Sequence, residues 1–373
     1  MSVHPRVLHT DCALYRGSMP CAPHKEFGQL CVDCPAYQPF TDRILIVKLA
    51  AMGDVFRTGA LLPDIVARHE RPQVTWLTHV ESVELLEGNP LVNRVVSTAE
   101  AAVLQTEYFD AVYALDSDAE GLALARSVKA RSYHGFIAGP FATCVGVANG
   151  GDPALFEIGV WDDLKRANRR PYLDLLASSV GVTYSGHRPW IAIDPDEARR
   201  ASESMRGLPR PRIGVNVDTS TRWERKQWNA EYVTEFVRRV DQDGAAAILF
   251  GGAEAHAQNK SLARSYPNRV FAFASAGSAS RLIAGIGQCD VILTGDTLAM
   301  HLAWALEIPI VALFGPTSLP EIQLGKGDRK LAATELACLG CYLKTCTVSP
   351  HCMDLLTPEL VYANVREVLA ACK

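Results

Sequence analysis

Short apolar runs alternate along the chain with segments in which apolar side chains recur at helical spacing. In the first half, apolar runs predict strands at residues 43–49, 73–78, 93–97 and 109–115. Residues 55–69 and 81–87 carry apolar positions three and four apart, so we expect helices there. Strands that alternate with helices in this way favour a parallel sheet covered on both faces.

A second series of the same kind begins near residue 212. Apolar runs predict strands at residues 212–217, 245–250, 270–273, 291–294 and 310–314. Amphipathic spacing predicts a helix at 231–241 and a last helix at 358–372. The stretch between the two series, 150–196, is mostly helical in pattern and has Pro189 and Pro195 near its end. We therefore expect it to connect two domains.

These patterns predict an α/β protein with four parts. They are a cysteine-rich segment at 1–40, an N-terminal domain at 41–190, a C-terminal domain at 191–356 and a terminal helix at 357–373. Two doubly wound domains of this kind place their ligands at the carboxyl ends of the strands.

The turn that follows the predicted strand 291–294 is a candidate site for phosphate. Gly295, Asp296 and Thr297 lead straight into a short helix, whose first backbone N–H groups lack partners within the helix. Such a helix start attracts anions, and His301 lies one turn further on. An Asp or Thr that merely caps the helix is the commoner alternative.

Composition and charge narrow the class of protein. The chain has 373 residues, a formal net charge of −4 and an isoelectric point near 6.2, with 21% charged residues, so nothing indicates a nucleic-acid partner. The N-terminus lacks the apolar stretch of a signal peptide, which favours the cytoplasm. Without a run of eighteen apolar residues we expect no membrane-spanning helix. Peripheral membrane association and oligomer formation stay open.

Eleven cysteines need a separate explanation, because eight of them fall into two groups. Each group contains one pair spaced C-x2-C, the spacing with which two thiolates bind one metal ion. We expect a structural zinc or iron ion at these cysteines, with His24 or His351 as substitute ligands. One shared site or two separate sites, free thiols and disulfides remain alternatives. The groups are Cys12, Cys21, Cys31 and Cys34, and Cys338, Cys341, Cys346 and Cys352.

Three motifs, in the same order along the chain, resemble glycosyltransferase family 9, the heptosyltransferase family. Residues 44–58 look like its opening motif, and Lys226-Gln227-Trp228 is similar to its lysine–tryptophan element. Residues 295–301, together with 314–317, resemble its second signature. The chain contains neither GxGxxG nor GxxxxGK[ST], so a conventional dinucleotide site or P-loop is not indicated.

The resemblance implies a GT-B fold, in which two Rossmann-like domains face a central cleft. It further implies an inverting transfer from a nucleotide-sugar, ADP-heptose or a relative, to an acceptor hydroxyl on a glycan, a lipopolysaccharide core, a protein or a small molecule, with no catalytic metal. Leu298 departs from the family pattern, which usually has Gly there. A side chain at this position removes backbone freedom and narrows the nucleotide pocket, so the resemblance defines the donor less closely than it defines the family. The second cysteine group is similar to a tail found in many members. A branch of the family, the autotransporter heptosyltransferases, holds iron through cysteines.

Inverting transfer needs a base that takes the proton of the acceptor hydroxyl, and a positive environment for the departing diphosphate. Asp54, at the first strand-to-helix turn, is the predicted base; its alternative is an N-cap for the helix 55–69. Lys226 is predicted to stabilise the diphosphate, although without the family motif it would be a surface lysine. The donor is expected to contact further residues, namely Asp296, Thr297, His301, Glu254, Thr317 and Thr219.

The acceptor is expected to meet Lys48, Arg57 and Asp116, which lie at or after the first and fourth predicted strands. Lys48 has the alternative of an ion pair with a carboxylate. Two other functions also stay open. One is a non-catalytic nucleotide-sugar-binding protein that senses metal or redox state through its cysteines, and the other is a sugar-nucleotide epimerase with a GT-B fold.

Overall fold

The chain divides into two units, each built on its own sheet. The computed structural model describes residues 7–371 except 18, 218–225, 276 and 344. For residues 253 and 254 it describes the backbone alone. Unit 1 comprises residues 1–49, 61–156 and 176–185, and unit 2 comprises 50–60, 157–175 and 186–373. In the described part of the chain no helix is long and apolar enough to cross a bilayer.

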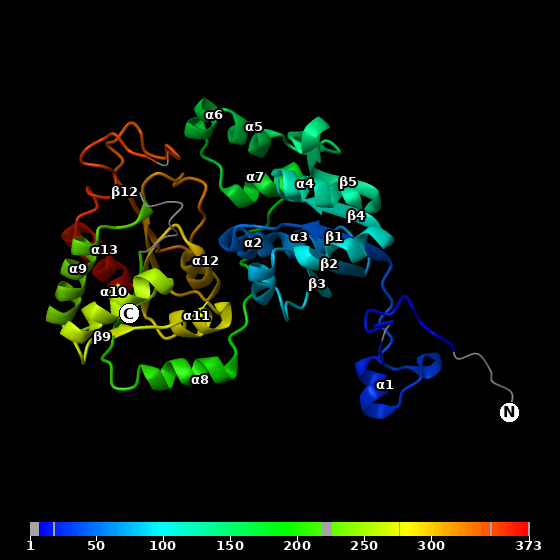
Figure 1. Ribbon diagram of the computed structural model, residues 1–373, viewed down its shortest axis with the longest axis horizontal. Coiled ribbons are helices and arrows are strands. Elements are labelled where there is room, and N and C mark those ends of the chain that lie inside the picture. Colours follow the sequence, from blue (N-terminus) through cyan, green and yellow to red (C-terminus); the bar gives the residue numbers. More distant parts are fainter. Residues whose placement is uncertain (1–6, 18, 218–225, 276, 344, 372–373) are drawn as a thin grey trace. The chain divides into compact units, whose positions relative to one another are not determined.

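The sheet of unit 1 is parallel except at one edge; Figure 1 labels five of its strands, β1 to β5. Its strand order is β3-β2-β1-β4-β5-β6, and only β6 runs antiparallel to its neighbour. The central strands are buried and apolar on both faces, as expected of a parallel sheet that is covered on both sides. Leu45, Val47 and Val112 belong to one buried cluster of this unit. The strands are β1 (Asp42–Val47), β2 (Pro72–Thr78), β3 (Arg94–Ser97), β4 (Tyr108–Ala114), β5 (Lys129–Ala138) and β6 (Cys144–Ala148).

Helices and 3₁₀ turns connect the strands of unit 1. The residues predicted as one helix at 81–87 form a 3₁₀ helix, η3 (Val80–Leu85). Asp118 caps α4 by accepting a hydrogen bond from the Gly121 N–H, so the polar turn after β4 starts a helix. The remaining elements are α3 (Leu62–Val66), η4 (Thr98–Thr106), α4 (Ala119–Ser127) and η5 (Pro140–Ala142).

All pairings in the sheet of unit 2 are parallel, in the order β12-β11-β10-β7-β8-β9. Read from β7, this order has the same form as that of unit 1 and is the strand order of Rossmann folds. The order reverses between β7 and β10, where crossovers leave in opposite directions. The strands are β7 (Arg212–Asn216), β8 (Ala246–Leu249), β9 (Val270–Ala272), β10 (Val291–Gly295), β11 (Ile310–Phe314) and β12 (Arg329–Ala332).

Two sets of helices cover the sheet of unit 2. Phe236 of α9 and Val361 and Val365 of α13 pack with β7 and β10 in one buried cluster. Helix α12 contacts β10, β11, α11 and α2. Three elements lie where the division changes unit, namely α5 (Ala154–Val160), η2 (Gly59–Leu61) and α7 (Tyr172–Ser179). The helices assigned wholly to unit 2 are α2 (Met52–Thr58), α6 (Asp162–Ala167), α8 (Pro195–Ser204), α9 (Ala230–Gln242), α10 (Ala253–Ser265), α11 (Ala279–Ile286), α12 (Leu298–Ala305) and α13 (Pro358–Ala371).

The helix predicted at 55–69 is interrupted. Helix α2 ends at Thr58, η2 follows, and α3 begins at Leu62 with Pro63 in its first turn. Proline lacks the N–H that a continuous helix needs and is tolerated only in a first turn, so the chain restarts there. This break leaves α2 in unit 2 and α3 in unit 1.

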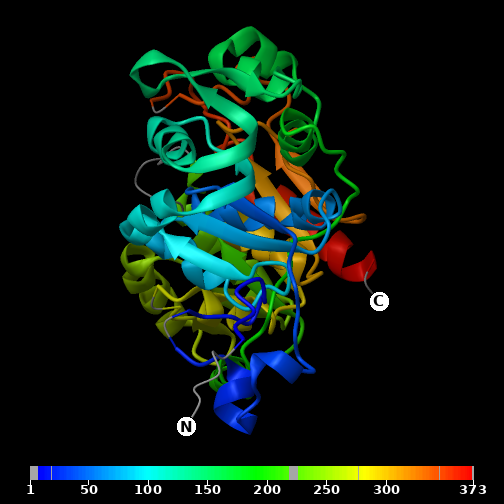
Figure 2. The ribbon, with the colours of Figure 1, turned by 90° about the vertical axis from the view of Figure 1, so that its right-hand side faces the viewer.

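The N-terminal segment, residues 7–40, contains only short elements, α1 (Ala22–Phe27) and η1 (Cys31–Asp33). Figures 1 and 2 both show α1 set apart from the sheet of its own unit. A bridge between Cys12 and Pro39 closes the segment into a loop.

Candidate active site

A glycine brings two helices of unit 2 together at the carboxyl end of its sheet. A Cβ atom added at Gly53 of α2 would lie 3.2 Å from Cδ2 of His301 and 3.6 Å from the N and Cα atoms of Leu298. No larger residue fits here without displacing a neighbour. The Met-Gly-Asp turn of the first motif therefore lies directly against the start of α12, the second predicted motif.

Asp54 and Arg57 form an ion pair on the exposed side of α2. Arg57 Nη2 lies 2.7 Å from Asp54 Oδ1, and the guanidinium stacks on the ring of Tyr172 with its central carbon 3.8 Å from the centroid. The Asp54 side chain is 37% exposed, whereas Arg57 is nearly covered. Asp54 is the third residue of α2 and Ala51 occupies the N-cap position without a side-chain cap, so Asp54 is not the N-cap. The Asp54 carboxylate is therefore partly accessible to solvent.

Lys226 and Asp296 form a second ion pair in unit 2. Lys226 Nζ donates to Asp296 Oδ2 over 3.1 Å, and both side chains are largely buried. Asp296 follows β10, and Lys226 lies in the connection between β7 and α9. The lysine is thus held at the point where the strand order reverses.

Hydroxyl and amide side chains join β7 to β10 at the same place. Asn216 Nδ2, at the end of β7, donates to Thr297 Oγ1 over 3.1 Å, and Thr297 Oγ1 is also 3.1 Å from Thr294 Oγ1. Thr297 occupies the N-cap position of α12, but its side chain makes no cap bond. The N–H groups of the first turn of α12 therefore have no side-chain acceptor from the cap residue.

His301 is buried among the charged groups of both ion pairs. Burial lowers its pKa to about 4, with a further contribution from the positive charge of Arg57, while the carboxylates of Asp296 and Asp54 oppose that shift. The imidazole is therefore neutral at physiological pH. It can donate one hydrogen bond and accept another without adding charge to the site.

Six buried polar atoms of unit 2 have no hydrogen-bond partner among the described residues. Besides Thr58 Oγ1, Arg212 Nε and Gln323 Oε1, they include Arg57 Nε, Thr317 Oγ1 and Glu321 Oε1. Burial raises the pKa of Glu321, and the charge of Arg57 opposes that shift. Because buried polar atoms are nearly always hydrogen-bonded in native proteins, these atoms indicate a place where a bound molecule or water completes the network.

The segment around Tyr342 supports the loop after β11. Tyr342 N–H donates to the Pro316 carbonyl over 2.8 Å, and the Ser318 N–H donates to the Tyr342 hydroxyl over 3.1 Å. Sγ of Cys352 would lie only 2.8 Å from a Cβ atom added at Gly315. The cysteine-containing tail thus packs under the Gly-Pro-Thr turn that carries Thr317, a contact that the sequence patterns did not indicate.

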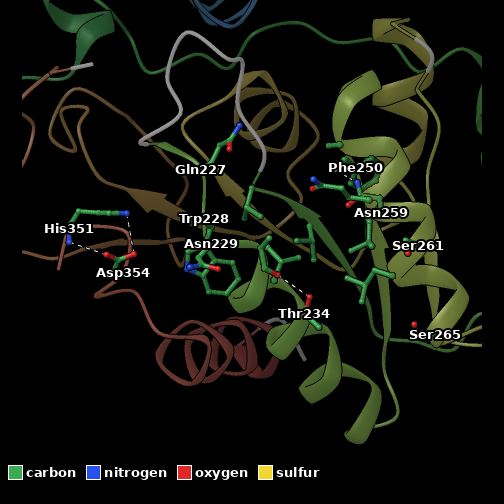
Figure 3. Close-up of a pocket in the computed structure, with 18 residues that line it drawn as sticks. Gln227, Trp228, Asn229, Thr234, Phe250, Asn259, Ser261, Ser265, His351 and Asp354 are labelled. Carbon is green, nitrogen blue, oxygen red and sulfur yellow. Dashed lines mark hydrogen bonds and ion pairs between the residues drawn. The ribbon is translucent and has the colours of Figure 1, made fainter. Parts of the chain in front are cut away.

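Trp228 anchors the lysine–tryptophan motif. Its indole N–H donates to the Leu356 carbonyl over 2.8 Å, and its ring packs edge-on against Tyr232 and Phe236. Beside it lies a cavity of about 700 Å³ between α9 and α10 (Figure 3). Asn259, Thr234 and the His351–Asp354 pair line this cavity, which shares no residue with the two ion pairs above. Among the described residues that line the cavity there is no cluster of charged side chains comparable to the two ion pairs.

In unit 1, Lys48 and Asp116 form a buried ion pair. The Lys48 ammonium contacts one carboxylate oxygen of Asp116, and the Leu49 N–H donates to the other. Both side chains are buried, and burial raises the pKa of Asp116 while the charge of Lys48 opposes that shift. This pairing is the alternative that the sequence left open for Lys48, and both charges already have protein partners.

Two predicted donor contacts lie outside the described residues. Thr219 belongs to the stretch 218–225, and the side chain of Glu254 is likewise not described, although its backbone begins α10. Tyr172 and Glu321 were not predicted. Neither follows a strand in a recognisable motif, so only their tertiary contacts reveal them.

The cysteines carry free thiols wherever the structure describes them. Within those residues no three His, Cys, Asp or Glu side chains are grouped as metal ligands. Burial, followed by the negative charges of Cys341 and Cys346, raises the pKa of Cys352 to about 11. His351 uses Nδ1 to accept from the Met353 N–H and Nε2 to contact Asp354, so it is not free to replace a cysteine. The predicted structural metal stays a prediction.

Solved structures with the same fold support the architecture. A glycosyl transferase of family 9 from Veillonella parvula superposes with a TM-score of 0.68 at 19% identity, over 89% of this chain and 98% of that one. The ADP-heptose lipopolysaccharide heptosyltransferase II of Escherichia coli gives 0.65 at 17% identity, over 89% and 99%. An iron-containing dodecameric glycosyltransferase, TibC of enterotoxigenic E. coli, gives 0.53 at 11%, over 90% and 77%. At these identities the likeness concerns the fold.

The chain spans about half the length of the curated relatives that it matches. Lipooligosaccharide heptosyltransferase 2 of Campylobacter jejuni is 29% identical over 162 residues, which cover 42% of this chain and 50% of that protein. Lipopolysaccharide heptosyltransferase 1 of Pseudomonas aeruginosa is 31% identical over 169 residues, covering 40% and 46%. Residues 167–351 match the model of glycosyltransferase family 9 (heptosyltransferase).

Two Rossmann-like units, with charged side chains at the strand ends of the second, define a protein of the GT-B class, as the sequence predicted. Within that class, residues 167–351 match glycosyltransferase family 9, the heptosyltransferase family, and the resemblance drawn from the motifs is confirmed.

Proposed function

We propose that the protein is an inverting glycosyltransferase that transfers a heptose, or a closely related sugar, from an ADP-sugar to an acceptor hydroxyl. The observation that carries this proposal is the convergence of Asp54, Arg57, Lys226 and Asp296 around His301 and the start of α12. The match of residues 167–351 to the heptosyltransferase family supports the choice of sugar. Structures of E. coli heptosyltransferase WaaC with ADP and with an ADP-linked fluoro-heptose support the choice of nucleotide.

The diphosphate of the donor is proposed to bind at the start of α12. Lys226 supplies a positive charge, and the N–H groups of the first helical turn supply oriented donors. The pairing with Asp296 holds the lysine in position beforehand, so little reorganisation is needed when the leaving group gains charge. The Thr297 and Thr317 hydroxyls lie on the two connections that follow β10 and β11, and we assign both to the donor. Neutral His301 adds a hydrogen bond without repelling the diphosphate.

Asp54 is proposed as the base. Its carboxylate stays partly exposed while Arg57 fixes its position through one oxygen. The acceptor oxygen attacks the anomeric carbon as its proton passes to Asp54, and the bond to the diphosphate oxygen breaks on the opposite face. Configuration at that carbon therefore inverts. Lys226 and the helix start balance the departing charge, so the scheme uses no catalytic metal.

The acceptor is proposed to be an anionic or hydroxyl-rich glycan, such as the lipopolysaccharide core implied by the names of the relatives. Arg57 is the assigned contact in unit 2. Lys48 and Asp116 of unit 1 are also assigned to the acceptor, and they pair with each other in the structure. We place the reaction in the cytoplasm. Glu254 and Thr219 stay assigned to the donor, with Glu254 on the ribose.

Transfer assays with a panel of nucleotide sugars test the proposal. We expect ADP-heptose to be consumed in the presence of a deacylated lipopolysaccharide core. The product should have the anomeric configuration opposite to that of the donor, as determined by NMR. Lys226→Ala should weaken donor binding and turnover together, because its charge meets the diphosphate before and during departure. Lys260→Ala, which removes an exposed lysine on α10 of unit 2, is the matched control. Binding of UDP- or GDP-sugars in place of ADP-sugars would overturn the donor assignment.

A further inference from the structure

The N-terminal segment, residues 7–40, keeps a defined backbone without a hydrophobic core. None of its described residues is buried, and its large apolar side chains point to solvent, with Phe27 80% and Met19 66% exposed. Fewer than about 40 residues seldom bury enough apolar surface to fold without disulfides, metals or partners. Something other than hydrophobic burial must therefore hold this segment together.

Four thiols of the segment meet at one place. Cys12, Cys21, Cys31 and Cys34 all line a single cavity of about 30 Å³, together with Tyr15 and Tyr37. The chain approaches this cavity at three separate positions along the sequence. That volume is about the share of one water molecule in the liquid. The space suits a single small ion and is too small for a multi-iron cluster.

Backbone hydrogen bonds place the four cysteines around this cavity. The Cys34 N–H donates to the Cys31 carbonyl over 3.3 Å, so the C-x2-C pair occupies one 3₁₀ turn. The Lys25 N–H donates to the Cys21 carbonyl over 2.9 Å, and Cys12 is fixed by its bridge to Pro39. Each position is therefore set by the main chain, and only the side-chain torsion of each cysteine remains to orient its sulfur.

Two histidines lie near the four cysteines. His9 also lines the cavity, and its ring stacks on Tyr37 at 4.3 Å between centroids. His24 Nδ1 is hydrogen-bonded to the Gln29 carbonyl over 2.8 Å. The four sulfurs are free thiols, not disulfides, and as oriented they do not yet form a ligand set. Rotation about the Cα–Cβ bonds is the movement that would direct them inward.

We infer that residues 7–40 form a zinc-binding module in which Cys12, Cys21, Cys31 and Cys34 coordinate one Zn²⁺ ion. Four thiolates in a closed tetrahedral set are a structural zinc site, and the ion replaces the missing core as the source of folding energy. On binding, the thiols release their protons to solvent and four Zn–S bonds form; no oxidation takes place. The site is separate from the residues assigned to transfer, so its role is structural.

Metal analysis of the untagged full-length chain, purified under reducing conditions, tests the inference. We expect the double variant Cys31→Ser/Cys34→Ser to contain about one equivalent of zinc less than the wild type. The control Cys144→Ser removes a half-buried thiol of unit 1 outside both cysteine groups and should leave the zinc content unchanged. Protection of each variant by ADP in a thermal melt establishes that unit 2 is folded.

Cobalt provides a second readout. Co²⁺ added to the zinc-free wild type should give the intense visible and sulfur-to-metal bands of a tetrahedral thiolate site, and these bands should be lost in the double variant. Protease digestion should cut residues 7–40 faster once zinc is removed. Equal zinc in wild type and double variant, disulfides among the four cysteines, or iron with sulfide at the segment would each overturn the inference.

Discussion

At the residue scale, the pairing of Asp54 with Arg57 makes a sharp prediction about catalysis. Asp54→Asn keeps the size of the side chain but removes the base, so turnover should fall by roughly 10²–10⁴-fold. Donor affinity should stay within a few-fold, because Asp54 acts on the acceptor proton in the transition state. Single-turnover kinetics with calorimetry of donor binding would measure both quantities.

The matched control for that variant is Asp162→Asn, which removes an exposed carboxylate of unit 2 that pairs with Arg166. It should change neither rate nor affinity, since surface ion pairs contribute little. Near-normal turnover of Asp54→Asn would leave Asp54 with the role of positioning Arg57 and would remove it as the base.

His301 predicts a dependence of stability on pH. Its pKa is lowered by burial from 6.5 to about 4 in the folded chain, so between these values the unfolded state binds more protons. The contribution of His301 to the free energy of unfolding should therefore be fully present above pH 6.5. It should fall as the pH drops towards 4, by on the order of 2–3 kcal/mol.

Denaturant titrations of the wild type and His301→Gln across this window would isolate the contribution of His301. We expect the wild type to lose more stability on acidification than the variant, whose amide does not titrate. Parallel curves for the two proteins would show that His301 is not held neutral in the folded chain.

Sequence reasoning found those site residues that belong to a strand-to-helix turn. Asp54 and Asp296 each follow an apolar run, and a polar residue at that place indicates a ligand site. Tyr172 and Glu321 could not be found in this way, because their link to Arg57 arises when segments more than a hundred residues apart are packed together. For Lys48 the sequence left two alternatives open, a contact with the acceptor and an ion pair with a carboxylate. The pairing with Asp116 depends on how β1 and the end of β4 pack together, which the sequence pattern does not record.

At the element scale, the close approach of α2 and α12 depends on Gly53. Replacing a helical glycine with alanine normally stabilises a protein by about 0.5–1 kcal/mol. Here the new methyl group would lie 3.2 Å from the buried ring of His301, which has little room to move. We therefore expect that Gly53→Ala does not increase the stability of the protein. It should also reduce turnover by about tenfold, because the new methyl group displaces Asp54 and the start of α12.

Gly159→Ala is the matched control, because a Cβ atom there meets nothing within 4 Å. Gly159 also lies in a helix of unit 2, so the change in helix propensity is similar. Thermal melts and initial rates for both variants would separate the packing effect from propensity. Equal behaviour of the two variants would mean that the helix contact does not shape the site.

Element types were predicted well where apolar runs were long and poorly where polar residues intervened. The central strands β1, β4, β7, β10 and β11 are nearly continuous apolar runs and were predicted within a few residues. Strand β5 was missed, since Lys129, Arg131 and Ser132 break its apolar pattern and the strand is recognised only by its pairing with β4. The helix predicted at 55–69 was too long, because Pro63 was read as part of its interior.

At the scale of the whole molecule, each of the two units contains a sheet with the same strand order. The sequence predicted two doubly wound domains, but the order within each sheet depends on which side each crossover takes, which periodicity does not record. The division of the chain is also finer than a single boundary near residue 190, since residues 50–60 and 157–175 belong to unit 2. Tertiary contacts of α2 and Tyr172 account for this assignment.

This division predicts where ADP will act. Because Lys226, Asp296 and α12 all lie in unit 2, ADP should slow amide hydrogen exchange at residues 226–228 and 295–303 and leave β2 and β3 of unit 1 unchanged. At about 100 times its dissociation constant, ADP should add roughly 2.7 kcal/mol to the free energy of unfolding of the unit that binds it. Hydrogen-exchange mass spectrometry with and without ADP measures this protection directly.

Lys226→Ala should abolish the protection in unit 2, and Lys129→Ala, which changes an exposed residue at the start of β5, should preserve it. Protection confined to unit 1 would place the donor in the wrong half of the molecule for the proposed mechanism.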